Sequence, residues 1–534
     1  MTTTNTNPHA ITPTPLMPTL LWADDEIDLL KPHILFLKTK GYDIVTANSG
    51  TDALALVEQQ NFDLIILDEN MPGLTGLETL QRIKLAAPHI PVIMITKSEE
   101  ENIMDQAVGN KIADYLIKPV NPSQILLSIK KNLHSDRLVS DVASTDYRQE
   151  FARIAMRIGD ARTLADWMEL YKLLVHWELQ LSGAESGMAD MLMMQKQEAE
   201  GAFAKFVARN YESWVVPTAK GAVRPDSPLM SPDIFKSRVF PMLDSGEKVW
   251  LIIIDNFRYD QWAVIKPLLA DHFTFTDELY TSILPTATQY ARNAIFSGLM
   301  PIEIERLFPS LWVDEDSPEG KNLNESPLIA TQFERYRRKC KFSYTKINDS
   351  AAGERLLREF ANLRANDLNV VVINTIDMLS HARTESRMIR ELASTDAAYR
   401  SITESWFRHS PALEIFRRIA ESGGRILLTT DHGSIRVDRP VKVVGDKNTN
   451  SNLRYKIGKN LAYPAKEVYE IKQPARFGLP SPNVSSAYIF ARERDFFAYP
   501  NNFNHYVQYY DGTFQHGGIS MQEMLIPLIT LAPK

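Results

Sequence analysis

The stretch RILLTTDHG sets an aspartate and a histidine side by side where an apolar run ends. These residues are Asp431 and His432, and the runs VWLIIID and NVVVINTID end likewise in Asp255 and Asp377. Each run is apolar enough to form a buried strand. Because parallel strands end at a common edge of their sheet, we expect the four side chains to converge there. Carboxylates and imidazoles together are typical zinc ligands.

Two more histidines extend this set. His381 follows Asp377 by one helical turn, a spacing that puts an oxygen and a nitrogen ligand on one helix face. His516 lies in FQHGG, where the glycines let backbone approach a site closely. The collection predicts two ions of borderline softness, for which Zn²⁺ is a better fit than Mn²⁺.

A threonine begins the helical pattern TQYARNAIFSG, ten residues before its final glycine. In order and context, the motifs IIIDNFRYD, PTAT, DMLSHA, TDHG and QHGG resemble the phosphodiesterase branch of the alkaline phosphatase superfamily, whose Ser, Thr or modified-Cys nucleophile has this spacing. The resemblance implies Thr288 as the nucleophile, with Thr286 as the alternative. It further implies two zinc sites, one formed by Asp255, Thr288, Asp431 and His432 and the other by Asp377, His381 and His516.

A neutral threonine is a poor nucleophile, and metal coordination would activate its hydroxyl at neutral pH. The resemblance implies a phosphothreonyl intermediate that water then hydrolyses. Arg292 lies one helical turn beyond Thr288. It either contacts a phosphoryl oxygen or forms a surface ion pair.

The substrate class depends on the remaining cations. Strict monoesterases supply an extra cation for the third phosphoryl oxygen, and the sequence identifies none. Residues 436–476 hold ten Lys or Arg against four Asp or Glu, between His432 and His516. This basic loop is either a solvated segment or an electrostatic funnel for a polyanionic ester such as an oligonucleotide, with Tyr455, Tyr463 and Tyr469 stacking on its bases.

A second acidic site lies near the N-terminus. One apolar run ends in Asp24 and Asp25, and another ends in Asp68. Three carboxylates at one sheet edge repel one another unless a hard cation such as Mg²⁺ lies among them. Two further runs lead to Thr96 and Lys118. A carboxylate nucleophile, a Mg²⁺ site, a hydroxyl and an ammonium are what an aspartyl-phosphate requires.

The motifs WADDE, ILDENMPGLTG, MIT and DYLIKP resemble a response-regulator receiver domain. The resemblance implies Asp68 as the phosphoacceptor, with the Asn70 carbonyl joining Asp24 and Asp25 at Mg²⁺. Thr96 and Lys118 would contact the phosphoryl group, and Tyr115 would be the aromatic switch. The family usually has Ala or Gly after the switch Thr, whereas Lys97 stands here and puts the phosphoryl lifetime in question.

The elements that position these residues predict an α/β chain of several domains. A disordered tail (1–19) precedes a doubly wound parallel-sheet receiver (20–135), flavodoxin- or CheY-like, with the strands TLLWA, DIVTA, DLIILD, PVIMIT and DYLIK. Helical periodicity predicts a three-helix connector (136–217), with helices near 146–158, 161–182 and 188–211. Strands and helices alternate again in the effector domain (218–534), which by the resemblance given above would be an α/β metallohydrolase of the alkaline phosphatase superfamily.

The amino-acid composition limits the classes of protein to which the chain can belong. With 534 residues, 44% hydrophobic and 23% charged, the chain is typical of a soluble globular protein of several domains. Its formal net charge of −7 gives no global attraction to nucleic acid. One cysteine excludes an internal disulfide framework and favours a reducing compartment, so we expect a cytoplasmic protein. No apolar run predicts membrane insertion, and no helix-turn-helix predicts direct DNA binding.

A receiver, a helical connector and this hydrolase, in that order, resemble response regulators that carry a PglZ-type effector and are associated with type IX secretion. The resemblance implies a sensor histidine kinase as partner, a homodimer formed on phosphorylation, and control of zinc-dependent phosphodiesterase activity by phospho-Asp68. Two alternatives stay open. The same metals and Thr288 would serve a phosphomonoesterase or phosphotransferase. Alternatively, the metal domain is a protein-binding module for a transcription regulator, such as a sigma factor, or for a secretion component.

Overall fold

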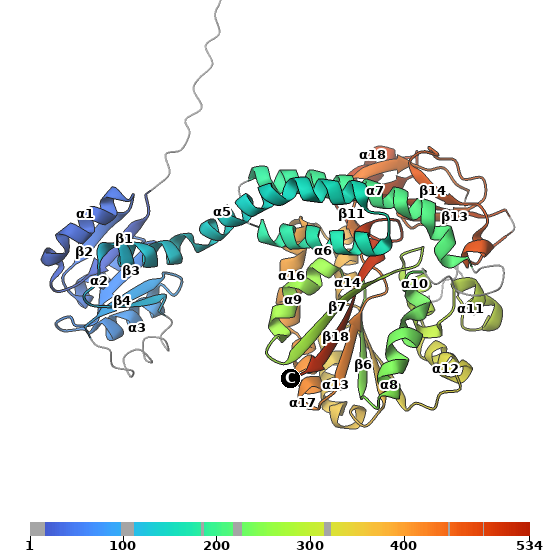
Figure 1. Ribbon diagram of the computed structural model, residues 1–534, viewed down its shortest axis with the longest axis horizontal. Helices are drawn as coiled ribbons and strands as arrows, with labels where there is room; N and C mark the ends of the chain where they lie inside the picture. The colour runs from blue at the N-terminus through green and yellow to red at the C-terminus, as the bar shows by residue number, and fades with distance from the viewer. Residues whose placement is uncertain are drawn as a thin grey trace, which may run out of the picture. The chain divides into compact units, whose positions relative to one another are not determined.

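The computed structural model describes residues 17–97, 112–182, 186–216, 227–313, 322–446, 449–483 and 485–534. The chain divides into two compact units, Met1–Ser144 and Thr145–Lys534, and each is described by itself below. Figure 1 labels the helices and strands. Within the described residues, no helix is both long enough and apolar enough to cross a bilayer.

The first unit contains the parallel sheet predicted for a receiver. Its strand order is β2-β1-β3-β4-β5, and the direction of winding reverses between β1 and β3. All five predicted strands are present: β1 (Thr19–Ala23), β2 (Asp43–Ala47), β3 (Leu64–Asp68), β4 (Val92–Thr96) and β5 (Asp114–Ile117). The helices among them are η1 (Ile27–Leu30), α1 (Lys31–Thr39), α2 (Gly50–Gln59) and α3 (Gly76–Ala86). Asp24 and Asp68 therefore end neighbouring strands at the switch point.

The helical connector consists of α5 (Pro122–Asp160), α6 (Leu164–Gln180) and α7 (Ser186–Val215). The sequence predicted its first helix to begin near 146, but α5 is a continuous helix of 39 residues that starts inside the first unit. Its sequence contains neither Pro nor Gly between its first residue and Gly159, so nothing local ends it earlier. Trp167 and Trp177 are buried among the connector helices.

The effector domain is built on a mixed sheet with the strand order β7-β18-β10-β6-β9-β8. Strands β10, β6, β9 and β8 run parallel, and β18 is antiparallel to both of its neighbours. The strands are β6 (Val249–Ile254), β7 (Phe273–Thr281), β8 (Phe342–Ile347), β9 (Leu368–Ile373), β10 (Arg425–Thr429) and β18 (Leu525–Pro533).

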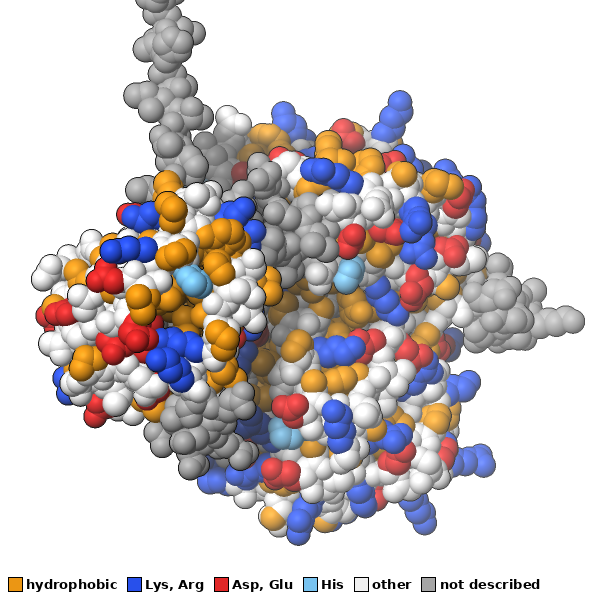
Figure 2. Space-filling view, turned by 60° about the vertical axis from the view of Figure 1, so that its left-hand side comes forward, with side chains coloured by type: hydrophobic (Ala, Val, Ile, Leu, Met, Phe, Trp, Pro, Cys, Tyr) orange, Lys and Arg blue, Asp and Glu red, His pale blue; other side chains and the backbone are white. Residues whose placement is uncertain are grey.

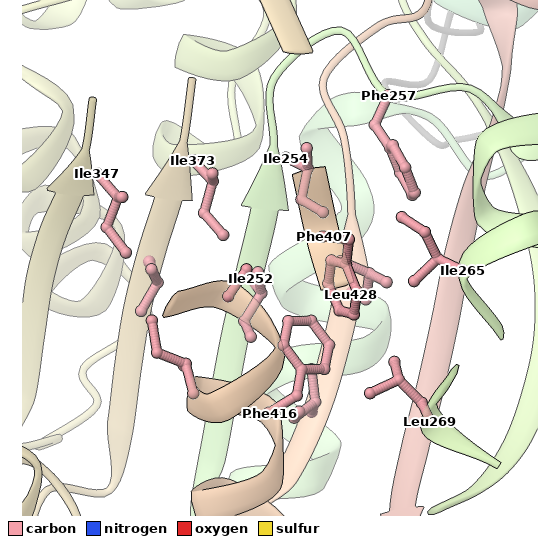
Figure 3. Close-up of a cluster of buried hydrophobic side chains, with 14 of the residues drawn as sticks. Ile252, Ile254, Phe257, Ile265, Leu269, Ile347, Ile373, Phe407, Phe416 and Leu428 are labelled. Carbon is pink, nitrogen blue, oxygen red and sulfur yellow. The ribbon is translucent and has the colours of Figure 1, made fainter. Parts of the chain in front are cut away.

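One face of this sheet is covered by four helices, α9 (Tyr259–Leu269), α13 (Ser350–Leu363), α16 (Asp396–His409) and α17 (Pro411–Glu421). Figure 3 shows how Ile252, Ile254 and Leu428 of the sheet pack against Phe407 and Phe416 of the helices. Burial of these apolar side chains fixes the strands, and so fixes the loops at their carboxyl ends.

Residues after β10 form several smaller sheets, and short strands interrupt the segment 436–476 that was predicted as a basic loop. These strands are β11 (Ile435–Arg436), β12 (Arg439–Lys442), β13 (Tyr455–Gly458), β14 (Val468–Ile471), β15 (Ala487–Ala491), β16 (Asp495–Ala498) and β17 (Phe514–Gln515). The buried residues Ile489, Ala491 and Phe497 lie in a core of their own. Within 436–476 the loop prediction missed the short strands, where apolar residues such as Val441 and Ile457 are buried between charged positions.

Shorter helices complete the domain: η2 (Ser231–Asp233), η3 (Phe235–Val239), α8 (Phe240–Asp244), α10 (Thr288–Ser297), α11 (Pro301–Leu307), α12 (Glu325–Arg335), α14 (Thr375–Glu385), α15 (Arg387–Leu392), η4 (Pro474–Phe477), α18 (Phe503–Tyr510) and α19 (Met521–Met524). Over the face shown in Figure 2, Lys and Arg side chains are interspersed with Asp and Glu. This mixture agrees with the small net charge of the chain.

Candidate metal centre and phosphoacceptor site

The first unit brings the predicted phosphoacceptor residues together. Lys118 Nζ lies 2.9 Å from Asp68 Oδ1 and 3.0 Å from Asp24 Oδ2. One carboxylate oxygen each of Asp24, Asp25 and Asp68 lies within 4.8 Å of the others. Burial raises the pKa of Asp68, and Lys118 opposes that rise. Two buried carboxylates with an exposed third beside them suit a hard cation such as Mg²⁺.

The other predicted receiver residues lie on or just beyond strands β3, β4 and β5. Thr96 ends β4 and is buried, and Tyr115 lies on β5, where burial raises its pKa. Asn70 is exposed just beyond β3. Lys97 Nζ lies 3.4 Å from Glu26 Oε2 at the surface, so the unusual cation pairs with a carboxylate near Asp24 and Asp25.

The effector sheet places one predicted ligand set by strand register. Ile253 of β6 is paired with Thr429 of β10, so Asp255 and Asp431 stand at the same level, two residues further on. Ligand atoms of Asp255, Asp431 and His432 all lie within 4.8 Å of one another, and the three side chains are buried. Asp255 Oδ1 is buried and has no hydrogen-bond partner within the described residues, as expected of an oxygen that accepts a cation.

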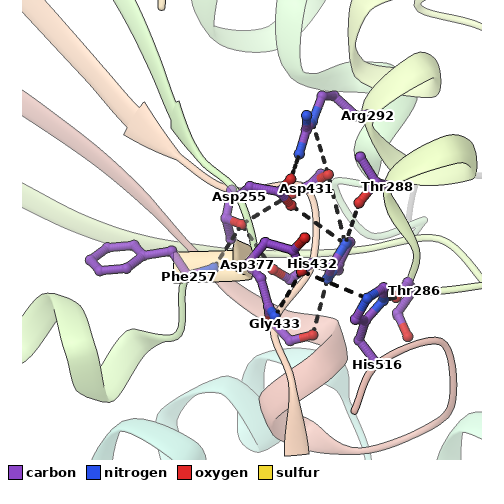
Figure 4. A network of polar contacts seen from close by, with 12 residues as sticks. Asp255, Phe257, Thr286, Thr288, Arg292, Asp377, Asp431, His432, Gly433 and His516 are labelled. Atoms are coloured by element: carbon purple, nitrogen blue, oxygen red, sulfur yellow. Dashed lines mark hydrogen bonds and ion pairs between the residues drawn. The ribbon is translucent and has the colours of Figure 1, made fainter. Parts of the chain in front are cut away.

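Ligand atoms of the second predicted set also lie within 4.8 Å of one another, and Figure 4 shows two of its members, Asp377 and His516, beside the first set. Asp377 lies in the first turn of α14, and His381 follows on the next turn, with His381 Nε2 3.4 Å from Asp377 Oδ2. His516 comes from the loop after β17, with its Nε2 3.9 Å from Asp377 Oδ1. The His432 and His516 rings stack at 4.1 Å between centroids, which brings the two sets into one centre.

Backbone carbonyls orient two of the imidazoles. His432 Nδ1 lies 3.1 Å from the Gly433 carbonyl, and His516 Nδ1 lies 3.2 Å from the Thr286 carbonyl. Because a carbonyl only accepts, Nδ1–H must donate in both rings, which leaves the lone pair of each Nε2 facing the centre. Burial lowers the pKa of His432 to about 4 and that of His516 to about 3, so both are neutral, as metal ligands must be.

Arg292 occupies a place that the sequence did not predict. It is 1% exposed, so the surface ion pair considered for it is wrong. Its Nε lies 3.0 Å from Asp431 Oδ2, it pairs with Asp255, and its Nη1 lies 3.2 Å from Glu325 Oε1. Its guanidinium thus neutralises carboxylates whose pKa values burial raises. No sequence signal identified Glu325, which looks like an ordinary acidic residue at a helix start.

The two candidate nucleophiles have different surroundings. Thr288 is the first residue of α10, and its Oγ1 lies 3.0 Å from His432 Nε2. Thr286 is fully buried, with its Oγ1 donating to the Gly518 carbonyl at 2.9 Å and accepting from Gly517 N–H at 3.1 Å. Thr286 therefore ties the His516 loop to the segment before α10, and Thr288 carries the hydroxyl that faces the centre.

A cavity of about 500 Å³ opens over this centre. Its described lining is Ala287, Thr288, Gln289, Asn322, Asp377, His381, Ser451, Asn452, Leu453, Tyr455, Tyr510, Gln515 and His516. The basic segment therefore borders the site, as predicted, but through neutral side chains and Tyr455. Neither its Lys and Arg residues nor Tyr463, Tyr469 and Arg292 occur in that described lining.

Two cations of the basic segment pair with carboxylates of later strands and helices. Arg454 is buried against Glu523, and Arg439 lies 2.7 Å from Asp495 and 2.6 Å from Glu493. Paired cations contribute little to a long-range field. No Lys or Arg of this segment occurs in the described lining of the cavity, and the electrostatic funnel considered for it stays a prediction.

Three family profiles together match nearly the whole chain. The BREX system PglZ alkaline phosphatase-like domain matches residues 234–531, more than half of the chain. The PorX response regulator linker domain matches residues 137–215, and the response regulator receiver domain matches residues 20–130. The chain thus joins a receiver, a PorX-type linker and an alkaline phosphatase-like domain. A receiver implies a histidine kinase as partner, and alkaline phosphatase-like domains depend on metal ions.

Curated relatives are similar over part of their length. The alginate biosynthesis transcriptional regulatory protein AlgB of Pseudomonas syringae pv. tomato is 26% identical over 41% of this chain and 46% of its own. The alkaline phosphatase synthesis transcriptional regulatory protein PhoP of Bacillus subtilis is 29% identical over 28% of this chain and 62% of its own. The chain thus spans about half of the length of such relatives. Among solved structures, the Vibrio cholerae chemotaxis protein CheY4 is 29% identical, with a TM-score of 0.21, over 22% of this chain and 99% of its own.

Proposed function

The chain belongs to the PglZ alkaline phosphatase-like family, and we propose that its effector domain is a metal-dependent phosphodiesterase controlled by phosphorylation of Asp68. The observation that carries the proposal is the position of the Thr288 hydroxyl. It lies 3.0 Å from His432 Nε2, at a centre where two sets of carboxylate and imidazole ligands meet. A hydroxyl in such a place is suited to nucleophilic attack on phosphorus.

Two zinc ions fit the donor sets better than a hard cation, because each set contains imidazole nitrogen. Asp255, Asp431 and His432, with Thr288, would hold one ion, and Asp377, His381 and His516 would hold the other. Zinc bound there would supply the positive charge that lowers the pKa of a hydroxyl and stabilises a departing oxygen.

The chain's own residues then define a two-step reaction. Thr288 loses its proton to water, its oxygen forms a bond to phosphorus, and the bond to one alcohol of the diester breaks as that alcohol takes up a proton. A water molecule then attacks the phosphorus, and the bond between phosphorus and the Thr288 oxygen breaks. This step restores the Thr288 hydroxyl and releases a phosphomonoester. Thr288 stands at the N-terminus of α10, whose partial positive charge lies where negative charge develops.

The composition of the cavity supports a diester rather than a monoester substrate. Its described lining holds no Lys or Arg to meet the third phosphoryl oxygen of a monoester. Tyr455 and Tyr510, with the neutral polar side chains of Asn452 and Gln515, suit a flat, uncharged group such as a nucleobase. A nucleotide-type diester, including a short oligonucleotide, is the substrate class that this lining favours.

Regulation would begin at the receiver. A sensor histidine kinase would phosphorylate Asp68, and the change at Thr96 and Tyr115 would promote a homodimer. The dimer would position or open the zinc site. We propose a role in the regulation of type IX secretion, which the PorX-type linker supports, with a sigma factor or a secretion-system component as the expected partner.

The deciding experiment compares bis-p-nitrophenyl phosphate with p-nitrophenyl phosphate as substrates of the zinc-loaded full chain. We expect faster turnover of the diester, loss of that turnover in Thr288→Ala, and its retention in Thr288→Ser, which keeps a hydroxyl. Faster turnover of the monoester would assign the domain to the phosphomonoesterases. Full biological output from Thr288→Ala would instead make the domain a protein-binding module.

A further inference from the structure

Arg258 is a fully buried cation three residues after Asp255. Its guanidinium makes a two-pronged contact with Asp260, at 2.9 Å from Nε and 2.7 Å from Nη2, and a 2.7 Å contact with Asp396 from Nη1. A guanidinium without exposed surface is tolerated only while its counter-ions stay in place. None of these three residues is a predicted metal ligand, so the mechanism proposed above leaves the group unexplained.

The same guanidinium packs against two aromatic rings that support ligand segments. Arg258 Cζ lies 5.1 Å from the centroid of the Phe514 ring and 5.5 Å from that of the Tyr399 ring. The two rings stack on each other with 4.3 Å between their centroids. Phe514 precedes His516 by two residues. The Tyr399 hydroxyl donates to the carbonyl of Ile376 at 3.1 Å, directly before Asp377.

A third ligand segment closes on the Arg258 side chain. Gly433 follows His432, and a Cβ added at Gly433 would lie 3.3 Å from Arg258 Cγ and 2.0 Å from the Gln522 carbonyl. Only glycine allows this turn to pack so closely. Arg258, directly or through an aromatic ring that it contacts, therefore touches four chain segments that carry predicted metal ligands. These ligands are Asp255, Asp377, His432 and His516.

Ion pairs connect this cation to the connector helices. Arg400 Nη1 lies 3.0 Å from Asp260 Oδ2 and 2.8 Å from Glu178 Oε1 on α6. Glu178 Oε2 lies 2.6 Å from Lys196 Nζ on α7. The side chains of Arg400, Glu178 and Lys196 are 5%, 17% and 15% exposed, so solvent screens these pairs weakly.

The route also reaches α5. The Tyr147 hydroxyl on α5 donates to Gln195 Oε1 at 2.7 Å, and Gln195 Nε2 donates to the Phe151 carbonyl at 2.8 Å. Gln195 is the neighbour of Lys196 on α7. The three connector helices are thus joined to one another, and through Glu178 to the cation behind the candidate metal centre.

We propose that Arg258 is a positioning residue for the metal-ligand segments, and that Glu178 ties it to the connector, so that the placement of the connector helices sets the geometry of the hydrolytic centre. The inference rests on the proposed function for the role of that centre. A movement of α6 that withdraws Glu178 would leave the charges of Arg400 and Asp260 without full compensation. It would thereby loosen the stacking of the Tyr399 and Phe514 rings. In a buried network the loss of one charge weakens the contacts of its partners, because each charge depends on the next.

The test uses the full chain with Glu178→Gln and, as its matched control, Glu169→Gln. Glu169 lies on the same helix and pairs with Lys172 at 3.0 Å, but its side chain is 64% exposed. We expect Glu178→Gln to accelerate the loss of zinc to a chromogenic chelator by about tenfold, at the low end of effects seen when supports of metal ligands are removed. Glu169→Gln should match the wild type.

A second variant, Tyr399→Phe, removes the hydroxyl bond to Ile376 and keeps the ring. If Glu178 and Tyr399 act through the same route, their effects on zinc release will be non-additive in the double variant. Independent, multiplicative effects would overturn the proposal, as would equal zinc release from Glu178→Gln and Glu169→Gln.

Hydrogen exchange separates this inference from the proposed function. Faster amide exchange over 514–518 in Glu178→Gln, measured without zinc or substrate, would support the positioning role. Unchanged exchange there would overturn that role. An absence of diester turnover in the wild type would overturn the proposed function while leaving the exchange comparison intact.

Discussion

Arg292 donates from Nε to Oδ2 of Asp431 over 3.0 Å, and both side chains are almost fully buried. The same guanidinium pairs with Asp255. One internal cation therefore partly compensates the charge of two carboxylates that are proposed to hold a metal ion. The arrangement gives the buried carboxylates a counter-charge of the protein's own.

Replacing Arg292 by Gln should destabilise the metal-free protein by about 3–5 kcal/mol, since buried carboxylates lose their partner. Zinc should restore part of this loss, so the stabilisation by zinc will be larger in Arg292→Gln than in the wild type. Urea unfolding with EDTA and with zinc measures both values. Arg238→Gln, which removes a half-exposed pair with Glu278, should change stability by less than about 1 kcal/mol.

Asp68→Ala should abolish phosphorylation by acetyl phosphate, because Asp68 is the carboxylate that Lys118 contacts at 2.9 Å. Dimer formation by sedimentation and diester turnover should then no longer respond to acetyl phosphate. Asp43→Ala, at an exposed aspartate on β2, should respond as the wild type does. An undiminished response of Asp68→Ala would break the proposed coupling between receiver and effector.

The predicted ligand sets came from strand ends, and strand ends are readable in sequence. Asp255, Asp377 and Asp431 each follow an apolar run, and parallel register brings such residues to one edge. Glu325 and Arg258 were not predictable, because their roles come from partners that no local pattern identifies, such as Arg292 and Asp396. The surroundings of the basic segment could not be predicted for a related reason. The sequence shows which residues are charged, but it does not show which of them form ion pairs, as Arg454 does with Glu523.

The structure also predicts a specific dependence of stability on pH. Burial raises the pKa of Glu200 from 4.5 to about 8. The folded chain therefore keeps a proton that the unfolded chain releases, and the stability from this group is complete below pH 4.5 and is lost as pH rises through 8. The Glu200→Gln variant should not show this loss of stability. At pH 8 its free energy of unfolding should exceed that of the wild type by on the order of 5 kcal/mol at most.

Urea unfolding of Glu200→Gln and wild type between pH 5 and 8 measures the difference at each pH. Glu198→Gln changes an exposed carboxylate on the same helix and should reproduce the wild-type slope. Parallel slopes for Glu200→Gln and wild type would mean that Glu200 does not hold a proton in the folded chain.

Substrate preference should follow the charge of the cavity. Gln515 lines the cavity and donates to Thr513 Oγ1 at 3.1 Å, so its side chain can be replaced without leaving a buried charge unpaired. Gln515→Lys would bring an ammonium to a lining that has no Lys or Arg among its described residues. A charge-assisted hydrogen bond to the third phosphoryl oxygen contributes about 1.5–3 kcal/mol. The monoester-to-diester ratio of kcat/KM should therefore rise by about tenfold or more. Gln515→Met, which adds bulk without charge, should leave this ratio near the wild-type value, and an equal ratio in both variants would show that charge does not set the preference.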